Sequence, residues 1–193
     1  FLAAWEGAPT GRGTRALHID LLRQRGQDVA VAWSTADLFP GGLVAREWGA
    51  RGAEIRIRYE LHYPGFIPGC AGQTEQEDLF RLSSDRMTFT RVARRQYNAW
   101  HLAFHQVVGR LFQALAASDA GGLASVVPDP RLRARLPSAL APDPACDAAE
   151  PEGAATPSAV SMAALTADGR PWTLTWARAG GQWRLTAAAP VLQ

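Results

Sequence analysis

The feature that most limits the fold is an alternation of apolar and polar residues near the end of the chain, on both sides of a glycine pair. The runs PWTLTWA (171–177) and QWRLTAA (182–188) each place tryptophan and leucine on one side, and Gly180-Gly181 lies between them. This is the pattern of a β-hairpin. A third alternating run, SAVSMAALT (158–166), leads into the hairpin through Asp168-Gly169. We therefore expect three antiparallel strands with one apolar, aromatic face.

A helical pattern precedes these strands. In residues 101–116 the apolar side chains recur at the i, i+3, i+4, i+7 spacing of an amphipathic helix, as Phe104, Val107, Val108, Leu111, Phe112 and Leu115. A sheet with one apolar face needs a cover, so we expect this helix to lie against the strands. Short helical stretches are expected at GGLASVV (121–127) and PRLRARLP (130–137), and a mobile loop at 137–158.

The first half of the chain shows a similar order of elements. FLAAWEGAP (1–9) resembles the end of a helix cut off at Phe1, and TRALHIDLLRQRG (14–26) reads as a second helical stretch. Strands are expected in DVAVAW, in EIRIRYELHYPG and in a hairpin formed by EDLFRL and RMTFTRVARRQ. The sequence thus predicts an α+β protein with helices packed on curved antiparallel sheets, in two units at 1–97 and 98–193. A single α+β domain with one long sheet is the alternative.

Charge and hydropathy exclude some classes of function. All 20 basic residues are arginine and the net charge is +2. Residues 1–99 hold 13 arginines against 11 acids, and residues 100–193 hold 7 against 7. No strongly basic face is indicated, so we expect no binding to nucleic acid. No run of 18 apolar residues is present in the sequence, so no membrane-spanning segment is expected.

The two cysteines bear on the compartment. Cys70 and Cys146 both lie in segments rich in proline, glycine or alanine, which we interpret as loops. They are either two unrelated thiols or a disulfide of an exported protein. The sequence begins at Phe1 without an initiator methionine. These features favour a periplasmic or secreted location in a bacterium.

Two groups of polar residues have the spacing of functional sites. His101 and His105 lie one helical turn apart, as in metal sites, but such a site needs a third ligand, and packing beside the apolar stripe is the alternative. Arg91, Arg94 and Arg95 form a basic cluster on the last strand of the first half, with Arg91 and Arg95 on one face. They are interpreted as a solvated row that protects a sheet edge, or as a site for an acidic partner or small anion.

The second half resembles the cystatin-like, NTF2-like superfamily. The resemblance lies first in the order of helix, short helices and strands. Asp119 closes the first helix, Leu123 lies in the small second helix, and the chain ends on the strand Trp183-Arg184-Leu185-Thr186, as is common in this superfamily. It covers residues 101–193 well and residues 1–97 weakly. It implies a curved sheet that wraps a long helix into a cone, and the similar order of elements in the first half extends the expectation to two such units in tandem. Enzymes of this superfamily place Asp, His or Tyr inside the cone.

The inward positions predicted here in the second half are tryptophan and leucine, so no catalytic residue is assigned. The candidate ligand-binding residues are Tyr59 and Tyr63, which are expected on one apolar strand face, and Trp172 and Trp176. For the two tryptophans the alternative is a place in a packed core. No cofactor motif is recognised. The function expected is a non-enzymatic binding or assembly module with a protein partner. The alternative is a small-molecule binder, or an isomerase- or dehydratase-like enzyme, whose hydrophobic cone takes an apolar ligand.

Overall fold

A computed structural model of the chain describes residues 1–11, 13–144 and 156–191. The fold is of the mixed α+β class, mostly sheet, and the strands pair antiparallel. Internal contacts divide the chain into two compact units: unit 1 consists of Phe1–Leu61 and Glu75–Tyr97, and unit 2 of His62–Thr74 and Asn98–Gln193. The loop 62–74, which the sequence analysis assigned to the first half, therefore belongs to unit 2.

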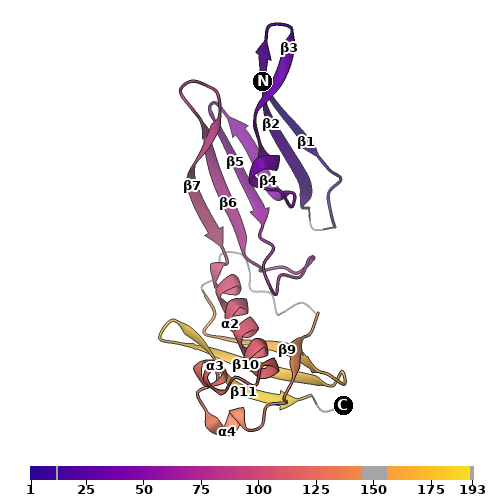
Figure 1. Ribbon diagram of the computed structural model, residues 1–193, viewed down its shortest axis with the longest axis vertical. Helices are drawn as coiled ribbons and strands as arrows, with labels where there is room; N and C mark the ends of the chain where they lie inside the picture. The colour runs from indigo at the N-terminus through magenta and orange to yellow at the C-terminus, as the bar shows by residue number, and fades with distance from the viewer. Residues whose placement is uncertain (12, 145–155, 192–193) are drawn as a thin grey trace. The chain divides into compact units, whose positions relative to one another are not determined.

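Unit 1 is built almost entirely of strands (Figure 1). Its elements are β1 (Leu2–Glu6), β2 (Arg15–Arg25), β3 (Asp28–Ser34), α1 (Thr35–Leu38), β4 (Val44–Arg51), β5 (Glu54–Glu60), β6 (Glu75–Leu82) and β7 (Phe89–Tyr97). The sheet order is β1-β2-β4-β5-β6-β7, and β3 pairs with β2 beyond the short β2–β4 contact. Strand β2 is hydrogen-bonded to three strands, β1, β3 and β4, and therefore connects the two parts of this sheet.

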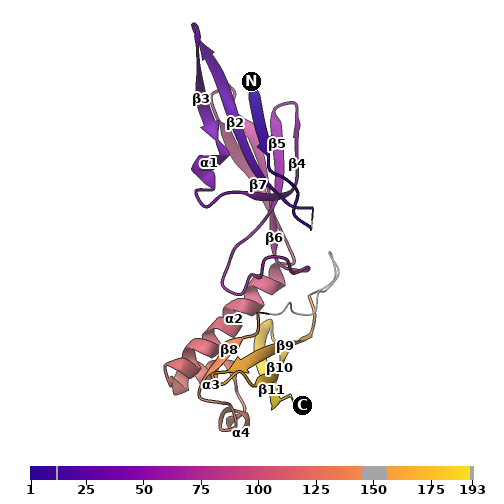
Figure 2. The same ribbon diagram turned by 90° about the vertical axis from the view of Figure 1, so that its right-hand side faces the viewer.

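The core of unit 1 lies between β2, β3 and α1 on one side and β4 to β7 on the other (Figure 2). Trp33 of β3 contacts Phe80 of β6, with ring centroids 5.7 Å apart, although these strands are not neighbours in the sheet. Phe39, which follows α1, contacts Tyr59 of β5 at 4.9 Å between centroids. These cross-core contacts show that the sheet folds over its own apolar face, where a covering helix had been expected.

The predicted N-terminal helices are wrong. Residues 2–6 and 15–25 are the paired strands β1 and β2, with Leu2 opposite Leu21 and Glu6 opposite Leu17. Leu17, Ile19 and Leu21 alternate into the core and are 5%, 0% and 8% exposed. The apolar residues of this run fit both the 3.6-residue period of a helix and the two-residue period of a strand. Hydrogen bonding to three neighbouring strands selects the strand. The predicted strands over DVAVAW, EIRIRY, EDLFRL and the segment that becomes β7 are confirmed.

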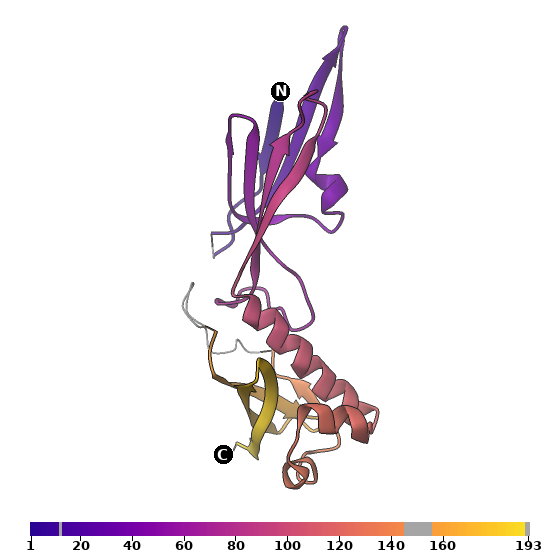
Figure 3. The ribbon, with the colours of Figure 1, turned by 90° about the vertical axis from the view of Figure 1, so that its left-hand side faces the viewer.

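Unit 2 packs helices on a second antiparallel sheet (Figure 3). Its elements are α2 (Ala99–Ala116), α3 (Ala120–Val126), α4 (Pro130–Arg133), β8 (Leu140–Pro142), β9 (Ala159–Thr166), β10 (Pro171–Ala179) and β11 (Gln182–Pro190), in the sheet order β11-β10-β9-β8. The predicted helix over 101–116 and the predicted three-stranded meander are confirmed. The expected loop at 137–158 is wrong at Leu140–Pro142, which pairs with β9, and its residues 145–155 lie outside the described residues.

The core of unit 2 joins the apolar stripe of α2 to the aromatic face of the hairpin. Phe104 and Trp176 are 0% exposed and their rings meet edge to face at 5.5 Å. Trp183 contacts Phe104 at 5.1 Å and Trp100 at 6.3 Å. Burial of such large side chains contributes about 2–3 kcal/mol each, so this cluster is the main attachment of helix to sheet. No helix in the described part of the chain is long and apolar enough to span a membrane.

The start of α2 is capped from outside the helix. Asn98 precedes the helix in the left-handed conformation (φ 49°), and its side chain makes no capping hydrogen bond. Instead, the hydroxyl of Thr74, which is 0% exposed, accepts from the amide of Leu102 (3.0 Å) and donates to the carbonyl of Asn98 (2.7 Å). The loop 62–74 thus supplies the group that the first turn of the helix needs.

Candidate functional site

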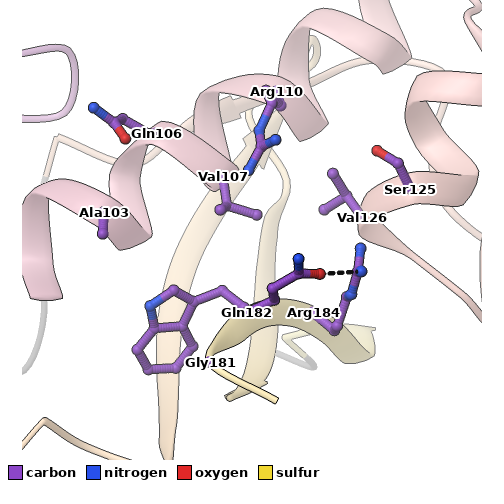
Figure 4. Close-up of a pocket in the computed structure, with 10 residues that line it drawn as sticks. Ala103, Gln106, Val107, Arg110, Ser125, Val126, Gly181, Gln182 and Arg184 are labelled. Atoms are coloured by element: carbon purple, nitrogen blue, oxygen red, sulfur yellow. Dashed lines mark hydrogen bonds between the residues drawn. The ribbon is translucent and has the colours of Figure 1, made fainter. Parts of the chain in front are cut away.

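A groove on unit 2, lined by described residues, has a volume of about 470 Å³ (Figure 4). Three elements form its walls. Residues 103, 106, 107 and 110 come from one face of α2, residues 125 and 126 from α3, and residues 181–184 from the hairpin turn and the start of β11. The α2 residues share a face because they are three or four positions apart. The groove therefore depends on packing of α3 and the hairpin turn beside α2.

The floor is apolar and the rim is cationic. Val107, Val126 and Trp183 are buried, at 8%, 1% and 4% exposure. Arg110 and Arg184 extend from opposite walls into the space between them, as Figure 4 shows. Arg184 donates from Nη2 to Oε1 of Gln182 at 2.5 Å. No acidic side chain is among the described residues that line the groove.

The polar groups that line the groove are mainly hydrogen-bond donors. Guanidinium and amide groups donate hydrogen bonds to carboxylates and other oxyanions. A general base would need Asp, Glu, His or a similar group, and none is among the lining residues that the structure describes. The one hydroxyl, that of Ser125, donates to the carbonyl of Gly122 in its own helix at 2.6 Å.

The sequence pattern gave no indication of this groove. Its rim residues lie beside the apolar stripe of α2 and not on it. Gln106 and Arg110 are four positions apart on α2, and Arg184 follows the hairpin turn. A single sequence does not show that this helix face and the hairpin turn lie together. The positions of Arg110 and Arg184 in the sequence therefore did not indicate a shared binding site.

The two candidate tyrosines belong to different units. Strand β5 ends at Glu60, so Tyr59 lies in unit 1 and Tyr63 in unit 2, and the expectation of a shared strand face is wrong. Tyr59 is 4% exposed and donates to Oδ2 of Asp78 at 3.0 Å. Burial, with the charge of Asp78 as a smaller cause, raises the pKa of Tyr59 to about 12. This hydroxyl therefore donates within a buried network of unit 1.

Tyr63 contacts the histidine pair. His101 and His105 are both 5% exposed, and their rings stack with centroids 4.3 Å apart. The hydroxyl of Tyr63 lies 2.7 Å from Nδ1 of His101. Among the described residues no third His, Cys, Asp or Glu joins the pair as a metal site would require. The pair packs the loop 62–74 onto α2, since Gly65 leaves no room for a side chain beside His105: an added Cβ would lie 2.1 Å from its Nδ1.

The candidate tryptophans are core residues. Trp176 is fully buried, and Trp172 is partly buried and packs against the same core. The indole N–H groups of Trp100 and Trp176 are buried with no acceptor among the described residues. A buried donor without a partner costs about 1–3 kcal/mol, so these two positions are exceptional for a packed core.

Cys70 is 6% exposed and takes part in a disulfide, and no cysteine among the described residues is free. The other cysteine of the sequence, Cys146, lies outside the described residues. Pairing of Cys70 with Cys146 therefore stays a prediction.

A Ser-His-Asp set in unit 1 is not a catalytic triad. Oδ1 of Asp20 and the hydroxyl of Ser34 lie 2.8 Å and 3.4 Å from His18, but both approach the same ring atom, Nε2. A triad needs the carboxylate on Nδ1 and the hydroxyl on Nε2. The Ser34 hydroxyl also accepts from the amide of Ala36 as the cap of α1. The set is therefore a local brace between β2 and β3.

Comparison with known proteins assigns no relative. A scan against protein-family models finds no match, and searches of curated proteins and of solved structures find none either.

Proposed function

We propose that this chain is a non-enzymatic binding module and that the groove of unit 2 is its recognition site. The observation that carries the proposal is an apolar floor flanked by two arginines that face each other across it. The ligand that fits this arrangement presents a carboxylate next to an apolar group, as an acidic and apolar segment of a partner protein does. Such a segment would lay its apolar part on Val107 and Trp183 and its charge between Arg110 and Arg184.

The filled interior supports a binding role over catalysis. Large apolar side chains occupy the space between α2 and the sheet, including Phe104, Leu111, Leu174 and Trp176, each 0% exposed. We propose that unit 2 belongs to the cystatin-like, NTF2-like superfamily, because a long helix packs against the apolar face of its antiparallel sheet. We do not extend this to unit 1, whose cover consists mainly of strands. The disulfide at Cys70 supports an oxidising, extracytoplasmic location.

The groove is tested with a small probe that carries the same chemistry. We would titrate the protein with 4-phenylbutyrate and with the neutral 4-phenylbutanol and follow backbone amide shifts by NMR. The expected result is saturable shifts at residues 103–110, 125–126 and 181–184 for the acid, and much weaker ones for the alcohol. The double variant Arg110→Gln/Arg184→Gln should lose the preference for the acid.

Arg135→Gln is the matched control, because Arg135 is an exposed arginine of unit 2 outside the groove. It should bind 4-phenylbutyrate as the unmodified protein does. Equal binding of acid and alcohol, or equal loss in the control variant, would show that the groove does not recognise carboxylates.

A second candidate is a small-molecule binder whose ligand displaces part of the packed interior of unit 2, and the unpartnered N–H groups of Trp100 and Trp176 favour it. A ligand with one hydrogen-bond acceptor on an apolar body would satisfy such a donor. A thermal-shift screen of apolar ketones against their hydrocarbon analogues tests it. This candidate predicts a rise in melting temperature for ketones alone, and Trp176→Phe should reduce that rise.

A further inference from the structure

The basic cluster on β7 is arranged differently from its sequence pattern. A bulge between Leu79 and Phe80 shifts the β6–β7 register, so that Arg94 lies opposite Asp78 and Arg91 opposite Phe80. Asp78 and Phe80 point to the same face of β6, which places Arg91 and Arg94 on that face together. The expectation that Arg91 and Arg95 share a face is therefore wrong. Bulges commonly redirect a side chain in this way next to functional sites.

A buried carboxylate holds the two arginines. The Asp78 side chain is 1% exposed. Arg94 donates from Nε to Oδ1 at 2.8 Å and from Nη2 to Oδ2 at 3.0 Å, while Nη1 of Arg91 lies 3.6 Å from Oδ2. Tyr59 donates to the same carboxylate from below. Asp78 thus fixes Arg94 in a bidentate geometry and attracts Arg91 to its side.

Stability alone does not explain this cluster. An apolar residue at a buried ionic position is often as stabilising as the ion pair or more so. The two guanidinium groups also reach beyond the carboxylate, since the side chains of Arg91 and Arg94 remain 48% and 43% exposed. Each guanidinium has five N–H donors, and Asp78 accepts hydrogen bonds from only two of the donors of Arg94. Two cations and one anion leave a local charge of +1 at the surface.

We propose that Arg91 and Arg94, positioned by the buried Asp78, form a carboxylate-binding site on unit 1 that is separate from the groove of unit 2. The outward N–H groups of the two guanidiniums donate to the two oxygens of the ligand, and the local charge of +1 matches a single carboxylate. Asp78 is the positioning residue. A small carboxylic acid and the acidic side chain of a partner protein share this chemistry.

The experiment follows the arginine Nε–Hε signals of the full chain by NMR during titration with sodium acetate, at ionic strength held constant with sodium chloride. Saturable shifts at Arg91 and Arg94, with a dissociation constant of about 1–10 mM, correspond to the few kcal/mol expected of one such ligand. Replacing Arg91 by Gln should weaken acetate binding about tenfold or more while the bidentate Asp78–Arg94 pair keeps unit 1 folded.

Arg95→Gln is the matched control, because Arg95 lies on the opposite face of β7 with its guanidinium 4.6 Å from the Tyr97 ring centroid. It should leave acetate binding unchanged. A parallel titration with a Glu-containing tetrapeptide and its Gln counterpart distinguishes a protein partner from a small acid, through tighter binding of the Glu peptide than of acetate. Shifts that fail to saturate, that occur equally with chloride, or that persist in Arg91→Gln would overturn the proposal.

Discussion

Thr74→Val is the substitution that most directly tests how the loop 62–74 supports unit 2. Valine has nearly the shape of threonine but lacks the hydroxyl, which here bonds both the Leu102 amide and the Asn98 carbonyl. Each such hydrogen bond contributes about 1 kcal/mol, and loss of a helix cap alone costs about 1 kcal/mol. We therefore expect Thr74→Val to lower the free energy of unfolding by about 2 kcal/mol.

The measurement is denaturant unfolding followed by circular dichroism at 222 nm, because α2 is the longest helix among the described residues and dominates that signal. For a unit of about a hundred residues the same loss lowers the melting temperature by roughly 8 °C. Hydrogen exchange adds a local measurement. The Leu102 amide should exchange faster in the variant, whereas the exchange rates of β10 amides should change only where exchange requires global unfolding.

Thr74→Ser is the control, since it keeps the hydroxyl and removes one methyl group. The reasoning requires Thr74→Val to be clearly more destabilising than Thr74→Ser. If serine proves equally or more harmful, the methyl contact and not the cap stabilises the helix start, and the role assigned to the loop is refuted.

Two further predictions concern buried groups. The pKa of Tyr59 is raised to about 12 from an unfolded value near 10, so its contribution to stability is complete below pH 10 and is lost as the pH rises through 12. Unfolding curves measured over a pH series should therefore show a steeper alkaline loss of stability in the unmodified protein than in Tyr59→Phe. Parallel pH dependences of the two proteins would contradict this assignment. Gly65→Ala should lower stability by more than about 1 kcal/mol, since its φ is +90° and the new Cβ would overlap His105. Gly180→Ala, which has a positive φ of +57° and open space, measures the backbone strain alone, so equal losses at the two glycines would show that contact with His105 contributes nothing.

Long periodic segments were predictable because they need only some apolar surface to pack against and no particular partner residue. The stripe of α2 needs only an apolar surface to cover, and the hairpin of β10 and β11 is specified by its own glycine turn and alternation. These elements form wherever a core is available, so local pattern sufficed for them. The same holds for β5, where Ile55, Ile57 and Tyr59 alternate into the core.

Short or irregular segments were not predictable, since their conformation depends on partners distant in the sequence. The run 14–26 fits a helix by spacing, and it becomes a strand because β1, β3 and β4 each satisfy part of its backbone. A backbone group that is buried must be paired, and the neighbouring strands offer that pairing along its whole length. The candidate sites depend on the same kind of distant contact.

The sequence by itself determined the α+β class, the helix of unit 2, the hairpin of β10 and β11 and strand β5, because the periodicity within each of these segments fits one type of element alone. Only the tertiary structure decided the strand identity of the N-terminus, the transfer of the loop 62–74 to unit 2, the groove between α2, α3 and the hairpin turn, and the pairing of Arg91 with Arg94. The physical reason is that each of these depends on a contact or a register shift between separate elements, and a side-chain pattern within one element carries no record of which neighbour it will meet.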